Sequence, residues 1–140
     1  MKSGFIPALG TPLDENGNLC IESYKKQIDI IADAHVINEK YAVSVWKDAP
    51  FDGIKLIASK AADEMLNLNN IESSYVIYPE GGDAHISARS DQHGNVQRVM
   101  ERLGGGGHRG AAGAQLKDTG VNAAYDMLID ILNNPESEEK

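Results

Sequence analysis

A run of glycines leads directly into a histidine and an arginine, and these residue types are suited to binding an anion. The glycine run is made of Gly104, Gly105, Gly106 and Gly107, and His108 and Arg109 follow it. Glycine has no Cβ and reaches backbone angles closed to other residues, so an anion can approach its N–H group closely. Ordering such a run costs entropy, which argues against a purely connecting role, although a tight crossing of two backbones would also require glycine. The run therefore predicts a phosphate-binding loop, with a histidine proton donor and an arginine cation at its exit.

The arginines are concentrated around this loop. All four lie between residues 89 and 109, although the chain as a whole carries a net charge of -8. In the stretch 83–90, strand periodicity places His85, Ser87 and Arg89 on one face. Arginine forms forked hydrogen bonds with phosphate oxygens. We therefore expect Arg89 to reach the ligand, with Ser87 offering a hydroxyl, if this strand lies beside the glycine run.

Machinery for breaking a bond is not evident in the sequence. No Asp and His pair forms a compact motif of the kind used in general acid–base catalysis. His85, His93 and His108 also lack the close spacing of a recognised metal site, so no cofactor is expected in this chain. The residues predict a protein that holds a phosphate rather than one that cleaves it.

Composition narrows the function class further. Hydrophobic residues make up 41% of the 140 residues and charged residues 24%, as in ordinary globular domains. The net charge of -8 argues against broad, non-specific binding to nucleic acid or to an anionic membrane. Cys20 is the single cysteine, so no intrachain disulfide can form, and no apolar run approaches the roughly 18 residues of a membrane span. We expect a cytoplasmic location.

The elements that position these residues alternate between strand and helix patterns. The sequence predicts strands over 41–46, 71–78, 83–90 and 112–116, and helices over 53–68, 96–103 and 121–132. Residues 79–83 are expected to form a five-residue hairpin loop. The predicted caps of the three helices are Asp52, then Asn95, then Asp118 or Thr119. This order predicts an α/β fold in which a mixed β-sheet has helices packed on it.

The two ends of the chain differ in character from the rest. Residues 1–30 contain a short strand over 5–9, a turn, and the start of an amphipathic helix over 21–33. Residues 135–140 form an acidic tail. The expected domain organisation is therefore an N-terminal segment 1–30, a domain over 31–134 and the tail.

The combined motifs resemble a known family. The segments IASKAADEML, IESSYVIY, HISARSDQHGNVQRVMERL and GGGGHRGAAG are similar to the C-terminal, DHH-associated domain of the DHH phosphoesterases, and most of all to that of the cyclic-di-AMP phosphodiesterases. The resemblance covers about residues 31–132. It implies a substrate-binding domain in which the glycine loop, His108 and Arg89 contact a dinucleotide phosphate. The place of Arg109 in that pattern varies within the family.

The resemblance also implies partners outside this sequence. In the family, a separate domain carries an Asp-His-His motif and two manganese ions that activate water, and this sequence contains no Asp-His-His. The chain alone is therefore expected to be inactive. The implied ligands are cyclic di-AMP, linear diadenylate or short RNA, and a homodimer is a further expected assembly. The relatives are anchored in a membrane by upstream segments.

Alternatives remain open at this stage. The domain could instead come from a related nanoRNase, with a short RNA end as its ligand, or from an exopolyphosphatase, with polyphosphate as its ligand. It could also serve as a non-catalytic binding or dimerisation module. Residues 4–29 resemble the first strand and helix of aldolases related to dihydrodipicolinate synthase and N-acetylneuraminate lyase. Those enzymes are complete eight-stranded barrels, so only their first unit could be present, as a fusion or an extension.

Overall fold

The computed structural model of this chain describes residues 21–134, which form six strands and four helices. The strands are β1 (His35–Ile37), β2 (Tyr41–Val45), β3 (Ser73–Glu80), β4 (Asp83–Ser90), β5 (Gly106–His108) and β6 (Ala111–Leu116). The helices are α1 (Ile21–Ala32), α2 (Ile54–Met65), α3 (Val96–Arg102) and α4 (Val121–Asn133). None of these helices has the length and hydropathy that crossing a membrane requires.

The strands form one mixed sheet in the order β1-β2-β3-β4-β6-β5. β2 and β3 are parallel and are connected through α2, whereas every other neighbouring pair is antiparallel. The α/β class, with a mixed sheet and helices packed on it, is therefore confirmed.

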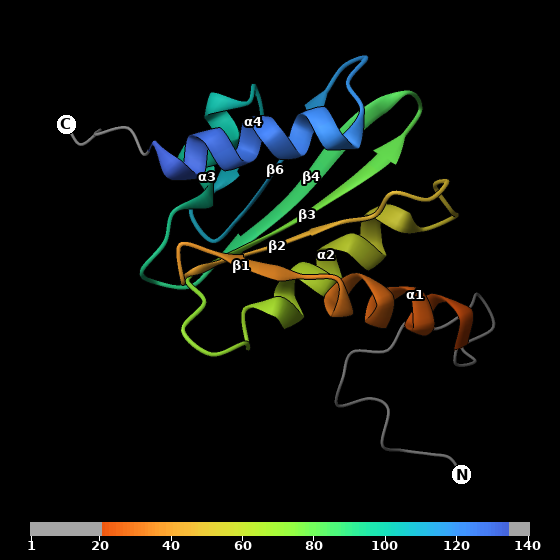
Figure 1. The fold of residues 1–140 in the computed structure, drawn as a ribbon, viewed down its shortest axis with the longest axis horizontal. Helices are drawn as coiled ribbons and strands as arrows, with labels where there is room; N and C mark the ends of the chain where they lie inside the picture. The colour runs from red at the N-terminus through yellow and green to blue at the C-terminus, as the bar shows by residue number, and fades with distance from the viewer. Residues whose placement is uncertain (1–20, 135–140) are drawn as a thin grey trace, which may run out of the picture.

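The helices cover the two faces of the sheet in pairs, with α1 and α2 on one face and α3 and α4 on the other (Figure 1). Alternation along the strands supplies both cores. In β3, Tyr75 and Ile77 pack with α3 and α4, whereas Val76 and Tyr78 pack with α1 and α2. The sheet is thus buried on both faces where helices cover it.

Buried serines fasten the first two helices to the sheet. Ser44 Oγ in β2 donates to the Ile30 carbonyl of α1 at 2.6 Å, and Ser74 Oγ in β3 donates to the Ala62 carbonyl of α2 at 2.6 Å. Neither hydroxyl is exposed to solvent. Because a buried hydroxyl needs a partner, these contacts fix where α1 and α2 lie over the strands.

The hairpin and two caps differ from the prediction. The loop between β3 and β4 is only Gly81 and Gly82, both with positive φ, because a two-residue turn of this kind matches the twist of the strands. Asn95 does cap α3 by accepting from the N–H of Arg98, but α2 begins after Gly53 and α4 after Gly120, neither with a side-chain cap. The predicted caps Asp52, Asp118 and Thr119 were therefore wrong.

Two short strands were not predicted. β1 has three residues and pairs with β2 at one edge of the sheet, and β5 lies within the glycine run at the other edge. The helix predicted over 21–33 is confirmed as α1. The predicted strand over 5–9 and the acidic tail 135–140 lie outside the described residues.

Candidate functional site

The polar side chains of β4 form one row, as the sequence predicts. His85, Ser87 and Arg89 pair across the strands with residues of β3 that face α2. The intervening Ala84, Ile86 and Ala88 are buried on the α3 and α4 side. The polar row therefore points toward the α2 face of the sheet.

Strand register carries this row across the sheet to the glycine run. Arg89 pairs with Ala111 of β6, and Ala111 pairs in turn with His108 of β5. Directly paired residues present their side chains on the same face. Arg89 and His108 therefore face the same side, two strands or roughly 10 Å apart.

Small residues form the floor between these two side chains. Ser87 pairs with Gly113, and Gly113 pairs with Gly106, so the next row of the same face carries almost no side chain. α2 contacts β3 and β4, and a pocket of about 690 Å³ lies over the part of the face beyond it. That volume falls within the usual range for small-molecule sites.

The pocket is positively charged for so acidic a chain. Its lining includes the cations Lys55, Arg89 and Lys117, with Glu80 as the carboxylate among the described lining residues. Ser59, Ser87 and Tyr78 contribute hydroxyl groups, and Gly104, Gly105 and Gly106 contribute backbone. His108 is exposed and stands next to the lining residue Ala111, at the rim. This arrangement suits an anionic ligand.

The glycines divide into two groups. An added Cβ at Gly105 would overlap the Gly113 carbonyl oxygen, and one at Gly107 would come within 2.5 Å of Ala112 Cα. Gly104 and Gly107 also have positive φ. These three glycines are needed for backbone conformation and for the close approach of β5 to β6. At Gly106 a Cβ would meet nothing within 4 Å, so this residue leaves open space over the pocket.

Two of the glycine N–H groups already have partners. The N–H of Gly104 donates to the Glu101 carbonyl at 3.1 Å, and that of Gly105 donates to the Met100 carbonyl at 2.8 Å. Both contacts satisfy carbonyl groups at the C-terminal end of α3. In this structure, Gly104 and Gly105 therefore line the pocket without offering their amides to a ligand.

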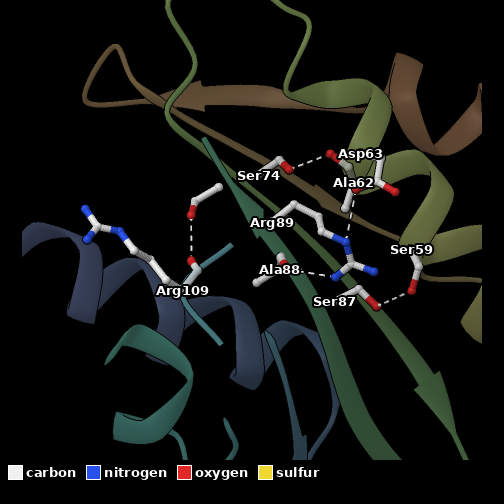
Figure 2. A network of polar contacts seen from close by, with 9 residues as sticks. Ser59, Ala62, Asp63, Ser74, Ser87, Ala88, Arg89 and Arg109 are labelled. Atoms are coloured by element: carbon white, nitrogen blue, oxygen red, sulfur yellow. Dashed lines mark hydrogen bonds and ion pairs between the residues drawn. The ribbon is translucent and has the colours of Figure 1, made fainter. Parts of the chain in front are cut away.

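Arg89 is held between α2 and its own strand, as Figure 2 shows. Its Nε lies 3.1 Å from Asp63 Oδ1, and its Nη1 donates to the Ala88 carbonyl at 2.8 Å. Ser87 Oγ lies 3.3 Å from Ser59 Oγ on the preceding turn of α2. The Arg89 side chain is 21% exposed, so it remains reachable from the pocket.

Arg109 does not join the other predicted site residues. Its Nε donates to the Gly94 carbonyl and its Nη2 to the Gln92 carbonyl, at 3.1 and 3.2 Å. In Figure 2 its guanidinium extends away from that of Arg89. The structure thus brings Ser87, Arg89 and the glycine run together, and uses Arg109 to hold the turn between β4 and α3.

Sequence patterns assigned no role in the site to four lining residues, Lys55, Ser59, Tyr78 and His85, or to Asp63, the partner of Arg89. The rings of Tyr78 and His85 stack with centroids 5.4 Å apart, at one end of the polar row. Burial, and secondarily the charge of Glu80, raises the pKa of Tyr78 above its ordinary value. Lys55, Ser59 and Asp63 recur every four residues on α2, which places them along one face of the helix. That spacing was the one signal available for them.

The part of the chain that the structure describes contains no cluster of side chains that could bind a metal ion. Within residues 21–134, no three His, Cys, Asp or Glu side chains gather as a metal site would require. The described residues therefore do not fit the manganese pair that the resemblance implies for a separate domain.

Comparison with known proteins places this geometry in a family context. The DHHA1 domain profile matches residues 38–134. The chain is 36% identical over 115 residues to the cyclic-di-AMP phosphodiesterase GdpP of Geobacillus thermodenitrificans, and 33% identical over 115 residues to PdeA of Listeria monocytogenes. Each alignment covers 81% of this chain but 17% of the relative, so the chain spans under a fifth of the length of these proteins.

A solved structure agrees on the fold. An exopolyphosphatase-related protein from Bacteroides fragilis superposes with a TM-score of 0.67 at 16% sequence identity, covering 81% of this chain and 35% of that one. At this identity the likeness supports the arrangement of strands and helices and carries nothing about the ligand.

Proposed function

Since this chain belongs to the DHHA1 domain family, we propose that it is the substrate-binding domain of a cyclic-di-AMP phosphodiesterase. It holds the phosphate of a dinucleotide in the pocket over β4, β6 and β5. Hydrolysis is carried out by an Asp-His-His domain with manganese, whether on the same polypeptide or on another. Two relatives named as cyclic-di-AMP phosphodiesterases support this substrate class.

The observation that carries the proposal is the placement of Arg89 and His108. They face the same side of the sheet and flank a floor made by Ala111, Gly113 and Gly106. A guanidinium can donate two hydrogen bonds to two oxygens of one phosphate, and an imidazole can donate a further hydrogen bond. The bare floor leaves room for the ligand to lie against the backbone.

The charge distribution supports an anionic ligand. Lys55, Arg89 and Lys117 line one pocket on a chain whose net charge is -8. A local cluster of cations focuses the potential within the pocket, whereas the acidic remainder disfavours long nucleic acids. A short dinucleotide fits this pattern better than a polymer does.

Binding affinity tests the proposal directly. Linear diadenylate and cyclic di-AMP are titrated into the full chain in metal-free buffer. Arg89→Ala removes charge-assisted hydrogen bonds worth about 1.5–3 kcal/mol, so affinity falls roughly 10- to 150-fold. His108→Ala causes a smaller loss. Arg102→Ala is the matched control, because Arg102 lies on α3 and donates to the Asn134 carbonyl.

The outcomes separate the proposal from its rivals. If Arg89→Ala binds both dinucleotides as tightly as the unaltered chain, the assignment of the pocket is wrong. Polyphosphate or short RNA displacing a dinucleotide at lower concentration would instead favour an exopolyphosphatase or nanoRNase substrate. Adding an Asp-His-His domain and manganese then tests the catalytic role, and hydrolysis that depends on Arg89 is the expected result.

A further inference from the structure

α2 and β4 meet along a strip of polar contacts, here called the polar seam, made by Ser59, Asp63, Ser87 and Arg89. Ser59 and Asp63 are one helical turn apart, and Ser87 and Arg89 are two residues apart on a strand, so both spacings place the pairs side by side. The contacts are the 3.3 Å approach of the two serine hydroxyls and the 3.1 Å ion pair of Asp63 with Arg89 (Figure 2). The seam ties the helix to the strand that carries Arg89.

The contacts made by Arg89 leave three N–H donors of its guanidinium for a ligand. Arginine has five N–H donors in a fixed plane. Nε is directed at Asp63 and one N–H of Nη1 at the Ala88 carbonyl. One N–H of Nη1 and both N–H groups of Nη2 remain as donors. These donors can form charge-assisted hydrogen bonds with phosphate oxygens.

We propose that Asp63 is a positioning residue for ligand binding, which holds Arg89 at Nε so that the end of its guanidinium is presented to a phosphate in the pocket. The inference rests on the proposed function and deepens it, because it adds to the site a residue that lies outside the pocket lining. Asp63 touches Arg89 and acts on the ligand through it.

The orientation that Asp63 provides outweighs the repulsion that its charge adds. Its side chain is 63% exposed, whereas that of Arg89 is 21% exposed. Solvent and salt therefore screen the Asp63 carboxylate from a ligand on the far side of the guanidinium. A free arginine side chain, in contrast, loses conformational entropy when a ligand fixes its rotatable bonds. A side chain that is already held in place avoids that loss.

Three variants separate orientation from charge. Asp63→Ala removes the acceptor, and affinity for linear diadenylate falls roughly three- to tenfold. Asp63→Asn keeps an oxygen acceptor for Nε while removing the charge, and affinity stays within about twofold. Glu64→Ala is the control, because Glu64 carries the same charge on the next position of α2 and takes no part in the polar seam. Its affinity also stays within about twofold.

Coupling to Arg89 is the readout that a merely structural role would not give. In an Arg89→Ala background, Asp63→Ala has no further effect on affinity. The proposal is overturned if Asp63→Ala binds as tightly as the unaltered chain or more tightly, or if its loss persists without Arg89.

The side-chain NMR signal of Arg89 gives a test that needs no ligand. We expect the Nε–H proton to be protected from exchange with solvent in the unaltered chain and in Asp63→Asn, and to lose that protection in Asp63→Ala. Persistence of the protection in Asp63→Ala overturns the inference. If the unaltered chain binds no dinucleotide, the proposed function fails, while this signal still reports whether Asp63 holds Arg89.

Discussion

Two adjacent glycines provide a sharp test of how the run is used, because alanine should lower stability at Gly105 and ligand affinity at Gly106. At Gly105 a Cβ would lie 2.7 Å from Ala114 Cα and would overlap the Gly113 carbonyl oxygen. Both are backbone atoms of β6, so neither can swing aside as a side chain would. Overpacking of this kind costs 1–3 kcal/mol or more, and we expect Gly105→Ala to lose about 3 kcal/mol of unfolding free energy.

Gly106 has no such contact. Its added Cβ meets nothing within 4 Å, and its φ does not lie in the positive region. The stability of Gly106→Ala should therefore stay within about 0.5 kcal/mol of the unaltered chain. The methyl group would, however, stand on the pocket floor in the row next to Arg89 and His108, so dinucleotide affinity should fall severalfold.

The assay is urea unfolding followed by Trp46 fluorescence, combined with dinucleotide titration of each variant. Gly105→Ala should lower the unfolding midpoint, and Gly106→Ala should lower affinity at an unchanged midpoint. An unchanged midpoint for Gly105→Ala would refute the close approach of β5 and β6. Unchanged affinity for Gly106→Ala would refute the placement of the ligand over the glycine floor.

Three further variants test other parts of the site. Lys55→Ala should weaken dinucleotide binding about two- to fivefold, because an exposed cation contributes modestly, and should reduce the salt dependence of the measured affinity. Arg109→Ala should lower the free energy of unfolding by about 1 kcal/mol through its lost carbonyl contacts, with dinucleotide affinity nearly unchanged. Hydrogen bonds from the N–H of Asp118 and, secondarily, from the side-chain amide of Gln115 lower the pKa of Asp83 in the folded chain. Asp83 therefore stabilises the fold at pH values above its ordinary pKa of 3.8, and this stabilisation is lost as the pH falls through the lower pKa of the folded state. Asp83→Asn should lack this acid-dependent loss in urea unfolding measured between about pH 2 and pH 5.

Local periodicity was sufficient to predict the elements that carry the site. A period of two identified the polar row of β4, and a period of 3.6 identified the helices that cover the sheet. Both depend on burial, which strongly restricts which residues can occupy each face. Asn95 was also predictable, since a cap needs only its own helix.

Long-range features could not be predicted in the same way. β5 is a strand because its glycines permit a close approach to β6, whereas glycine alone gives no strand signal. Arg109 was predicted as a ligand contact because it follows the histidine, but its direction depends on the turn between β4 and α3. Asp63 lies beside Arg89 only because the crossover through α2 sets which helix face meets β4.

The most direct test of the central claim is an NMR titration of the full chain with linear diadenylate and then cyclic di-AMP, in metal-free buffer. We expect saturable shifts in the amides of Gly106, His108 and Ala111 and in the side chain of Arg89, with little change on α3 and α4. Saturable shifts confined to the α3 and α4 face, or no shifts with either dinucleotide, would contradict it.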